Sequence, residues 1–134
     1  MKIRLAGLAL ASVLAHGANA QSQSHPPLTV SPVGVWHGTS VCLVRPSACN
    51  DEIVVYRITQ VKPADSVAID ARKIVRGEEQ GMGILGCLVS PNGQLTCVIP
   101  QGTWRFSVHN DSLNGEFRSR DNTRFRDVRA ARER

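Results

Sequence analysis

The sequence predicts an all-β fold, a single eight-stranded antiparallel up-and-down barrel in which the strands follow one another as a meander. Three observations carry this prediction: short runs of alternating apolar and polar residues, turn residues between them, and no segment with the apolar stripe of a helix. Eight sequential strands avoid open edges by closing into a barrel. A two-sheet sandwich is the alternative, but the short connections favour a meander over Greek-key crossings.

The hairpin around Pro91 is the most informative stretch. Its two apolar strands flank a turn in which Pro91 suits the first position, Asn92 the second, and Gly93 the left-handed closing position. A three-residue loop of this kind pairs Ser90 with Gln94. The residue numbers of each cross-strand pair in this hairpin therefore sum to 184.

The other strands are predicted where apolar runs lie between turn signals. All eight are expected at residues 34–44, 53–61, 67–75, 83–89, 94–99, 103–109, 112–118 and 123–129. The most regular alternation is at 103–109. Residues 76–81 are expected to form a polar loop.

Aromatic side chains are expected to face the barrel interior. Trp104 and Phe106 share one face of their strand, Phe117 lies on the inward face of the next, and Trp36 opens the first strand. These four residues could line a ligand cavity or fill a core. The small interior of an eight-stranded barrel favours a filled core.

The N-terminus has the three parts of a secretory signal peptide: a basic start, a short apolar run and a small-x-small site that ends at Ala20. We expect export to the periplasm or the medium. Because no cysteine precedes Cys42, no lipid anchor is expected, and the mature chain is predicted to be soluble and monomeric. The predicted organisation is a signal peptide at 1–20, a flexible arm at 21–32, the barrel at 33–129 and a basic tail at 130–134.

The cysteines of the mature chain are even in number, which in a small exported domain is typical of two disulfides. In the hairpin register Cys87 faces Cys97, and the pair is of the closer, non-hydrogen-bonded type if the pair beside the turn is hydrogen-bonded. We therefore predict a bridge between Cys87 and Cys97, which leaves Cys42 to pair with Cys49. The cysteine spacing does not fit a structural zinc site.

The positive charge is concentrated at the C-terminus. Removal of the signal peptide lowers the formal net charge from +5 to +3, because Lys2 and Arg4 leave with it. Residues 118–134 hold seven arginines. A charged terminal strand discourages edge pairing. This explanation is favoured over nucleic-acid binding, because no aromatic residues are expected among the arginines on an outer face and because the chain is expected to be exported.

Candidate catalytic and metal-binding residues do not form a recognisable set. His25 lies in the arm, and His37 and His109 are expected to point outward. The adjacent carboxylates at 51–52 and 78–79 are typical of solvated turns, and the chain has no Gly-x-Ser-x-Gly motif. We therefore predict no catalytic residue, no metal ligand and no cofactor.

The motif Gly34-Val35-Trp36 opens the first strand and resembles the Gly-x-Trp signature of lipocalins and other calycin barrels. In lipocalins the tryptophan plugs the closed end, and an arginine from the last strand stacks over it. The resemblance implies barrel-closing roles for Gly34 and Trp36, with Arg124 or Arg126 as the arginine. It also implies a non-catalytic binding role for a small apolar or amphipathic molecule.

The layout also resembles periplasmic inhibitors of bacterial metalloproteases, which are exported eight-stranded barrels with an N-terminal arm that enters the protease cleft. Residues 21–32 occupy the place of that arm. This chain departs from the inhibitors in its two local disulfides and its histidine-proline arm. The resemblance implies an alternative function, the binding of an exported protein such as a protease.

Overall fold

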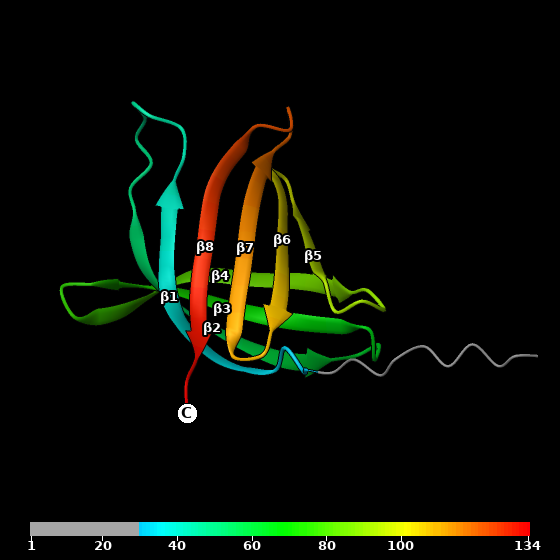
Figure 1. The fold of residues 1–134 in the computed structure, drawn as a ribbon. Coiled ribbons are helices and arrows are strands. Elements are labelled where there is room, and N and C mark those ends of the chain that lie inside the picture. Colours follow the sequence, from blue (N-terminus) through cyan, green and yellow to red (C-terminus); the bar gives the residue numbers. More distant parts are fainter. Residues whose placement is uncertain (1–29) are drawn as a thin grey trace, which may run out of the picture.

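The computed structural model describes residues 30–134 as a closed barrel of eight antiparallel strands (Figure 1). Each strand pairs with the next along the chain, and β8 pairs with β1 to close the sheet. The strands are β1 Gly34–Cys42, β2 Glu52–Val61, β3 Ser66–Val75, β4 Glu78–Val89, β5 Leu95–Ile99, β6 Gly102–His109, β7 Ser112–Ser119 and β8 Arg124–Arg132. The predicted fold class is therefore confirmed. The predicted signal peptide and residues 21–29 of the predicted arm lie outside the described residues.

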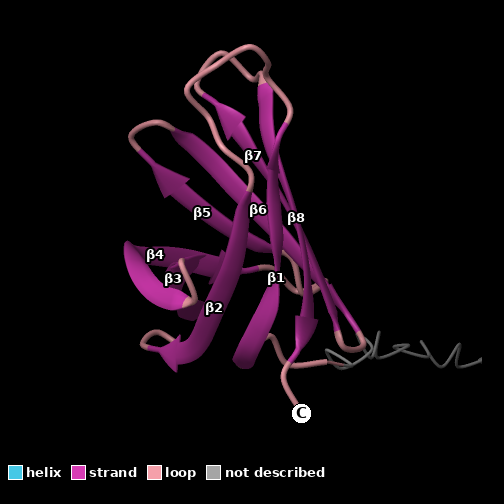
Figure 2. Cartoon of the chain, turned by 90° about the vertical axis from the view of Figure 1, so that its left-hand side faces the viewer, coloured by secondary structure: helices cyan, strands magenta, loops and turns pink. Residues whose placement is uncertain are grey.

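The strands are arranged as two groups that enclose one core. Figure 1 shows β1 and β5 to β8 running steeply up the view, with β3 and β4 crossing behind them. Figure 2 shows the same barrel from the side, with the strands spreading apart toward the top. The core between them is formed by inward side chains of every strand, the largest of which are Trp36, Phe106, Ile58, Ile69, Leu95 and Leu113. The part of the chain that the structure describes has no helix that could cross a membrane.

Close packing in the core depends on a glycine at one position. Gly115 on β7 faces Phe106 on β6. A Cβ atom at Gly115 would lie 2.4 Å from the Phe106 ring, closer than van der Waals contact allows. The aromatic ring therefore occupies the space that a side chain would take.

The predicted hairpin register is confirmed. The β4–β5 ladder pairs Leu88 with Thr96, and the numbers of this pair sum to 184. The Ser90 amide donates to the Gln94 carbonyl at 2.9 Å, and Gly93 has the left-handed φ of 83° that closes the loop.

Both predicted disulfides are present. Cys87 and Cys97 bridge the β4–β5 hairpin with their Cα atoms 4.2 Å apart, as expected for a non-hydrogen-bonded pair. Cys42 and Cys49 join the end of β1 to the following loop. Two disulfides indicate that the folded chain belongs to an oxidising compartment.

The loop expected at residues 76–81 is wrong. Only Arg76 and Gly77 turn the chain, with φ values of 52° and 81°, and β4 begins at Glu78. A two-residue turn with both φ values positive joins antiparallel strands directly. The β3–β4 hairpin extends beyond the barrel (green, left side of Figure 1), so its exposed strand residues show no apolar alternation.

The tail expected at residues 130–134 is also mostly strand. β8 continues to Arg132, and Ala130 is buried against Gly38 of β1. A Cβ atom at Gly38 would lie 1.9 Å from the Arg129 carbonyl oxygen, so the glycine allows β1 and β8 to approach each other. The last strand therefore closes the barrel along nearly its whole length.

Candidate functional site

One end of the barrel is closed by Trp36 and an arginine. The Trp36 side chain is fully buried, and its indole N–H donates to the Pro32 carbonyl at 2.9 Å. The Arg132 guanidinium lies 4.2 Å from the centre of the Trp36 ring, a cation–π contact. Arg132 also donates to the carbonyls of Val33 and Ser31, both at 2.7 Å.

The assignment of this role to Arg124 or Arg126 is wrong. In the β1–β8 ladder Trp36 faces Arg132, whereas Arg126 faces Cys42 at the other end of β1. Arg132 lies six positions after Arg126 on the strand, which corresponds to about 20 Å. Arg124 points outward and pairs with Asp127 at 2.7 Å.

The predicted interior aromatics divide between a filled core and a cavity. Phe106 is buried and packs edge-on against Tyr56, with ring centres 5.8 Å apart. The half-buried Trp104 is stacked on Phe106 at 5.5 Å and contacts Phe117 at 5.0 Å. Of the four predicted aromatics, only Trp104 lines the cavity described below.

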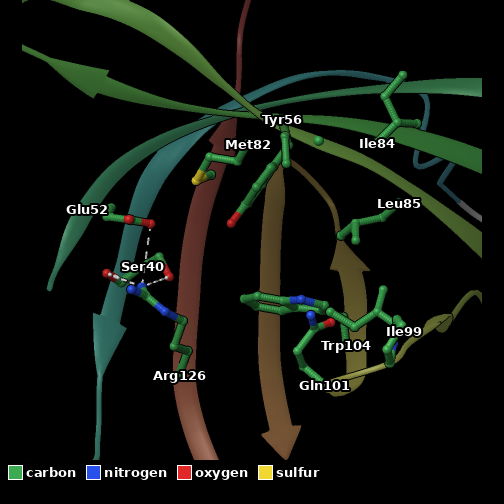
Figure 3. Close-up of a pocket in the computed structure, with 13 residues that line it drawn as sticks. Ser40, Glu52, Tyr56, Met82, Ile84, Leu85, Ile99, Gln101, Trp104 and Arg126 are labelled. Carbon is green, nitrogen blue, oxygen red and sulfur yellow. Dashed lines mark hydrogen bonds and ion pairs between the residues drawn. The ribbon is translucent and has the colours of Figure 1, made fainter. Parts of the chain in front are cut away.

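A cavity of about 430 Å³ lies at the end of the barrel away from Trp36 (Figure 3). The cavity lies between the middle of β4 and the β5–β6 turn, and it extends to Arg126 near the start of β8. Its apolar wall consists of Met82, Leu85, Ile99 and Trp104, and Ile84, whose side chain is largely exposed, lies at its rim. Its volume is in the range that holds a small organic molecule.

The cavity has a charged group within it. The Arg126 guanidinium donates to the Ser40 hydroxyl and to the Asn50 carbonyl, both at 2.7 Å, and lies 3.6 Å from the Glu52 carboxylate. Only 14% of the Arg126 side chain and 21% of the Glu52 side chain are exposed. Lys73 contacts the other oxygen of Glu52 at 3.7 Å. These interactions hold the ion pair in a fixed position on one side of the cavity.

Tyr56 lies between the packed core and the cavity. Figure 3 shows its hydroxyl directed into the cavity, toward the side where Glu52 and Arg126 lie. Burial raises the pKa of the Tyr56 phenol well above its ordinary value, the Glu52 carboxylate raises it further, and Arg126 acts in the opposite direction. The phenol therefore stays protonated at neutral pH and can donate a hydrogen bond.

The two described histidines lie apart from this cavity. His37 points outward and contacts Glu133 at 3.3 Å, and His109 is exposed at the end of β6. His25 lies outside the described residues. Within residues 30–134 no group of three metal-ligating side chains lies close enough to bind a metal ion.

Of the four adjacent carboxylates, Asp51 is an exposed loop residue as the sequence suggested, whereas the other three lie on strands. Glu52 is the first residue of β2 and lines the cavity. Glu79 lies on β4 and forms a bidentate ion pair with Arg57, at 2.7 and 2.9 Å, which lowers the pKa of the Glu79 carboxyl. Two adjacent carboxylates in a sequence are a weak signal for a shared site, because neighbouring residues on a strand point to opposite faces of the sheet.

Sequence reasoning missed Arg132, Tyr56 and Glu52 as residues that shape the two ends of the barrel. Tyr56 is the chain's single tyrosine and lies in an apolar run, which is a sequence signal for a buried polar group. Arg132 and Glu52 carry no such signal.

The fold is similar to those of two solved structures, an odorant-binding protein and a lipocalin allergen. The chain matches an odorant-binding protein, OBP1, with a TM-score of 0.53 and 13% identity over 78% of this chain and 75% of that one. It matches a dog lipocalin allergen with a TM-score of 0.50 and 11% identity over 78% and 74% of the two chains. No protein-family model matches the chain, and no curated protein matches it.

The described chain is therefore a small lipocalin-like barrel, and the resemblance predicted from Gly34-Val35-Trp36 is confirmed at the level of the fold. At these identities the likeness concerns the fold alone. The resemblance to metalloprotease inhibitors stays a prediction, because most of the arm on which it depends lies outside the described residues.

Proposed function

We propose that this chain is an exported, non-catalytic binding protein that holds a small amphipathic molecule in the open half of its barrel. The observation that carries the proposal is the cavity of about 430 Å³ with an apolar wall and a fixed polar side. The two similar structures are those of an odorant-binding protein and a dog lipocalin allergen, and the first of these is by name a binding protein.

The cavity chemistry indicates which molecules fit. Trp104 offers a flat aromatic face, and Met82 offers a flexible side chain that adapts to different shapes. On the polar side, Tyr56 and Arg126 both present hydrogen-bond donors. The proposed ligand therefore has an apolar body and a polar end that accepts hydrogen bonds.

The same groups suit binding better than catalysis. The Arg126 guanidinium stays charged, and the raised pKa of Tyr56 keeps its phenol protonated at neutral pH. Neither group exchanges protons readily with a substrate under these conditions. Their fixed hydrogen bonds position a ligand instead.

Binding of anilinonaphthalene sulfonate, a fluorescent probe with an aromatic body and an anionic end, tests this proposal. Ile99 faces the cavity and the adjacent Val98 faces solvent, so Ile99→Trp fills the cavity while Val98→Trp serves as the matched control. We expect Ile99→Trp to abolish the fluorescence titration and Val98→Trp to leave it unchanged. Equal binding by both variants would place the probe elsewhere and contradict the proposal.

The polar end has its own test. Tyr56→Phe removes only the hydroxyl that faces the cavity, so we expect affinity for the probe to fall about threefold to tenfold, the usual effect of one lost hydrogen bond. Unchanged affinity would show that the ligand's polar end does not reach this side of the cavity.

A further inference from the structure

The sheet is weakly joined between β4 and β5. β4 has twelve residues and pairs with β3 from Glu78 to Leu88, but it pairs with β5 only at Leu88 and Val89. Figure 1 shows β5 and β6 turning steeply away from β4. Within residues 30–134, the edge of β4 from Glu78 to Gly86 on the β5 side has no partner strand. Its outward-directed backbone N–H and C=O groups are free to pair with another strand.

The middle and end of this edge lack the charged residues and prolines that keep edge strands from pairing. Residues 81–89 contain no charged residue and no proline. The outward side chains beside the edge are apolar: Ile84 is 74% exposed, Leu88 61% and the neighbouring Val98 on β5 75%. Several exposed apolar side chains beside an open strand edge are typical of an interaction site.

The edge also allows close approach of another backbone. At Gly81, Gly83 and Gly86 an added Cβ atom would have no other atom within 4 Å, so these positions are open toward solvent. A bulge places Met82 between the pairs that Gly81 and Gly83 form with β3. Because glycine has no side chain, the backbone at these three positions is accessible to an incoming strand.

We propose that the free edge of β4 pairs antiparallel with the same edge of a second copy of this chain, with the two-fold axis near Gly81. A two-fold contact uses one surface twice, and an antiparallel strand edge is complementary to itself. With the axis at Gly81, Glu78 faces Ile84 of the second copy and Glu79 faces Gly83. The charge pattern fits this arrangement, because each carboxylate faces an uncharged residue and no like charges are opposed.

The pairing has a consequence for the cavity. Residues 82–85 form both the free edge of β4 and one wall of the cavity. A strand added to this edge lies along the open side of the cavity. The two-fold contact does not depend on the presence of a ligand, so it is testable separately from the proposed binding function.

Sedimentation velocity of the purified chain over a range of concentrations tests the contact. We expect a reversible monomer–dimer equilibrium. Amide hydrogen exchange in residues 79–86 should slow as the dimer fraction rises with concentration. A chain that stays monomeric at every concentration overturns the proposal. Dimers without slower exchange in this segment also overturn it, since another surface would then form the contact.

Substitutions at the edge give a sharper test. Ile84→Glu places a carboxylate opposite Glu78 of the second copy, so we expect dimerisation to weaken about fivefold or more. Ile53→Glu is the matched control, because Ile53 is also exposed but lies on the outer face of β2. In the Ile84→Glu background, Glu78→Lys replaces the repulsion by attraction and should restore the dimer. Equal weakening by Ile84→Glu and Ile53→Glu, or no rescue by Glu78→Lys, contradicts the proposed pairing.

Discussion

Arg132 is the residue that secures the closed end of the barrel. Its guanidinium covers the Trp36 ring and donates to the Val33 and Ser31 carbonyls, so one side chain connects the last strand to the segment that precedes β1. Asp111 contacts the same guanidinium at 3.4 Å. Each contact joins residues that are far apart in the sequence, so the contacts stabilise the closed barrel relative to any partly open form.

Replacement of Arg132 should therefore be costly. We expect Arg132→Ala to lower the free energy of unfolding by about 2–3 kcal/mol, from the lost cation–π contact and charge-assisted hydrogen bonds. Urea unfolding monitored by tryptophan fluorescence measures this loss. Arg124→Ala is the control: its side chain is half-exposed and forms surface ion pairs, so about 0–1 kcal/mol is expected. Equal losses in the two variants would contradict the role assigned to Arg132.

Residue-scale roles on the last strand could not be predicted from the sequence. Arg126 and Arg132 have the same residue type and lie on the same side of β8, and they differ only in how far along the barrel they stand. That position is set by the stagger of β8 against β1, which arises when the sheet closes. Local sequence patterns carry no information on this stagger.

The β4–β5 hairpin is the element whose local chemistry determines its structure. The turn residues specify the loop, the loop fixes the register, and the register brings Cys87 opposite Cys97. The structure adds that this bridge supports a ladder of only two residue pairs. The disulfide therefore holds together the weakest seam of the barrel, next to the cavity.

The two disulfides should differ in their contribution to stability. The chain-entropy argument gives similar values for rings of these lengths, about 2.5–3 kcal/mol each. Both hairpin cysteines are buried in the core, however, whereas Cys49 is only half-buried. Replacement of Cys87 and Cys97 by alanine should cost about 1–2 kcal/mol more than replacement of the other pair, because it also leaves a cavity. Urea unfolding of the two double variants compares them, and equal losses would show that the core contacts of the hairpin bridge add nothing.

The sequence and the structure disagree most at the elements that depend on their neighbours. The start of β4 could not be predicted from the sequence, because Glu78, Glu79 and Gln80 extend past the barrel, face solvent and so show no apolar alternation. The free edge of β4 could not be predicted either. A local turn indicates that two strands pair, but it does not indicate how far along the strands the pairing continues. The cavity borders this free edge, since residues 82–85 of β4 lie along it.

The barrel that residues 30–134 form has two differently filled halves. At the closed half, Trp36 and the core side chains fill the interior; at the open half, the cavity leaves room for a ligand beside the Arg126–Glu52 pair. The strand count and inward faces were predictable from alternation, but the filling of the interior was not, because it depends on how all eight strands are placed. Tyr56 stands at the boundary, with its ring in the core and its hydroxyl at the cavity.

The boundary position of Tyr56 predicts how the stability of the whole molecule depends on alkaline pH. Because burial raises the pKa of Tyr56 in the folded state, the phenol ionises in the unfolded chain first. Below the ordinary tyrosine pKa of about 10 the phenol is neutral in both states and has no effect on the pH dependence. Above that value the unfolded chain releases a proton that the folded chain retains, so stability falls by about 1.4 kcal/mol per pH unit.

Tyr56→Phe removes this proton release, so the free energy of unfolding of the variant should fall less steeply above pH ~10 than that of the unaltered chain. Urea unfolding at a series of alkaline pH values measures the two slopes. Tyr56 is the single tyrosine of the chain, so phenolate absorbance reports its ionisation directly. This absorbance should appear together with the loss of tryptophan signals, since ionisation requires the barrel to open. Phenolate absorbance that rises while the fold is intact would show that solvent reaches the hydroxyl through the cavity without unfolding.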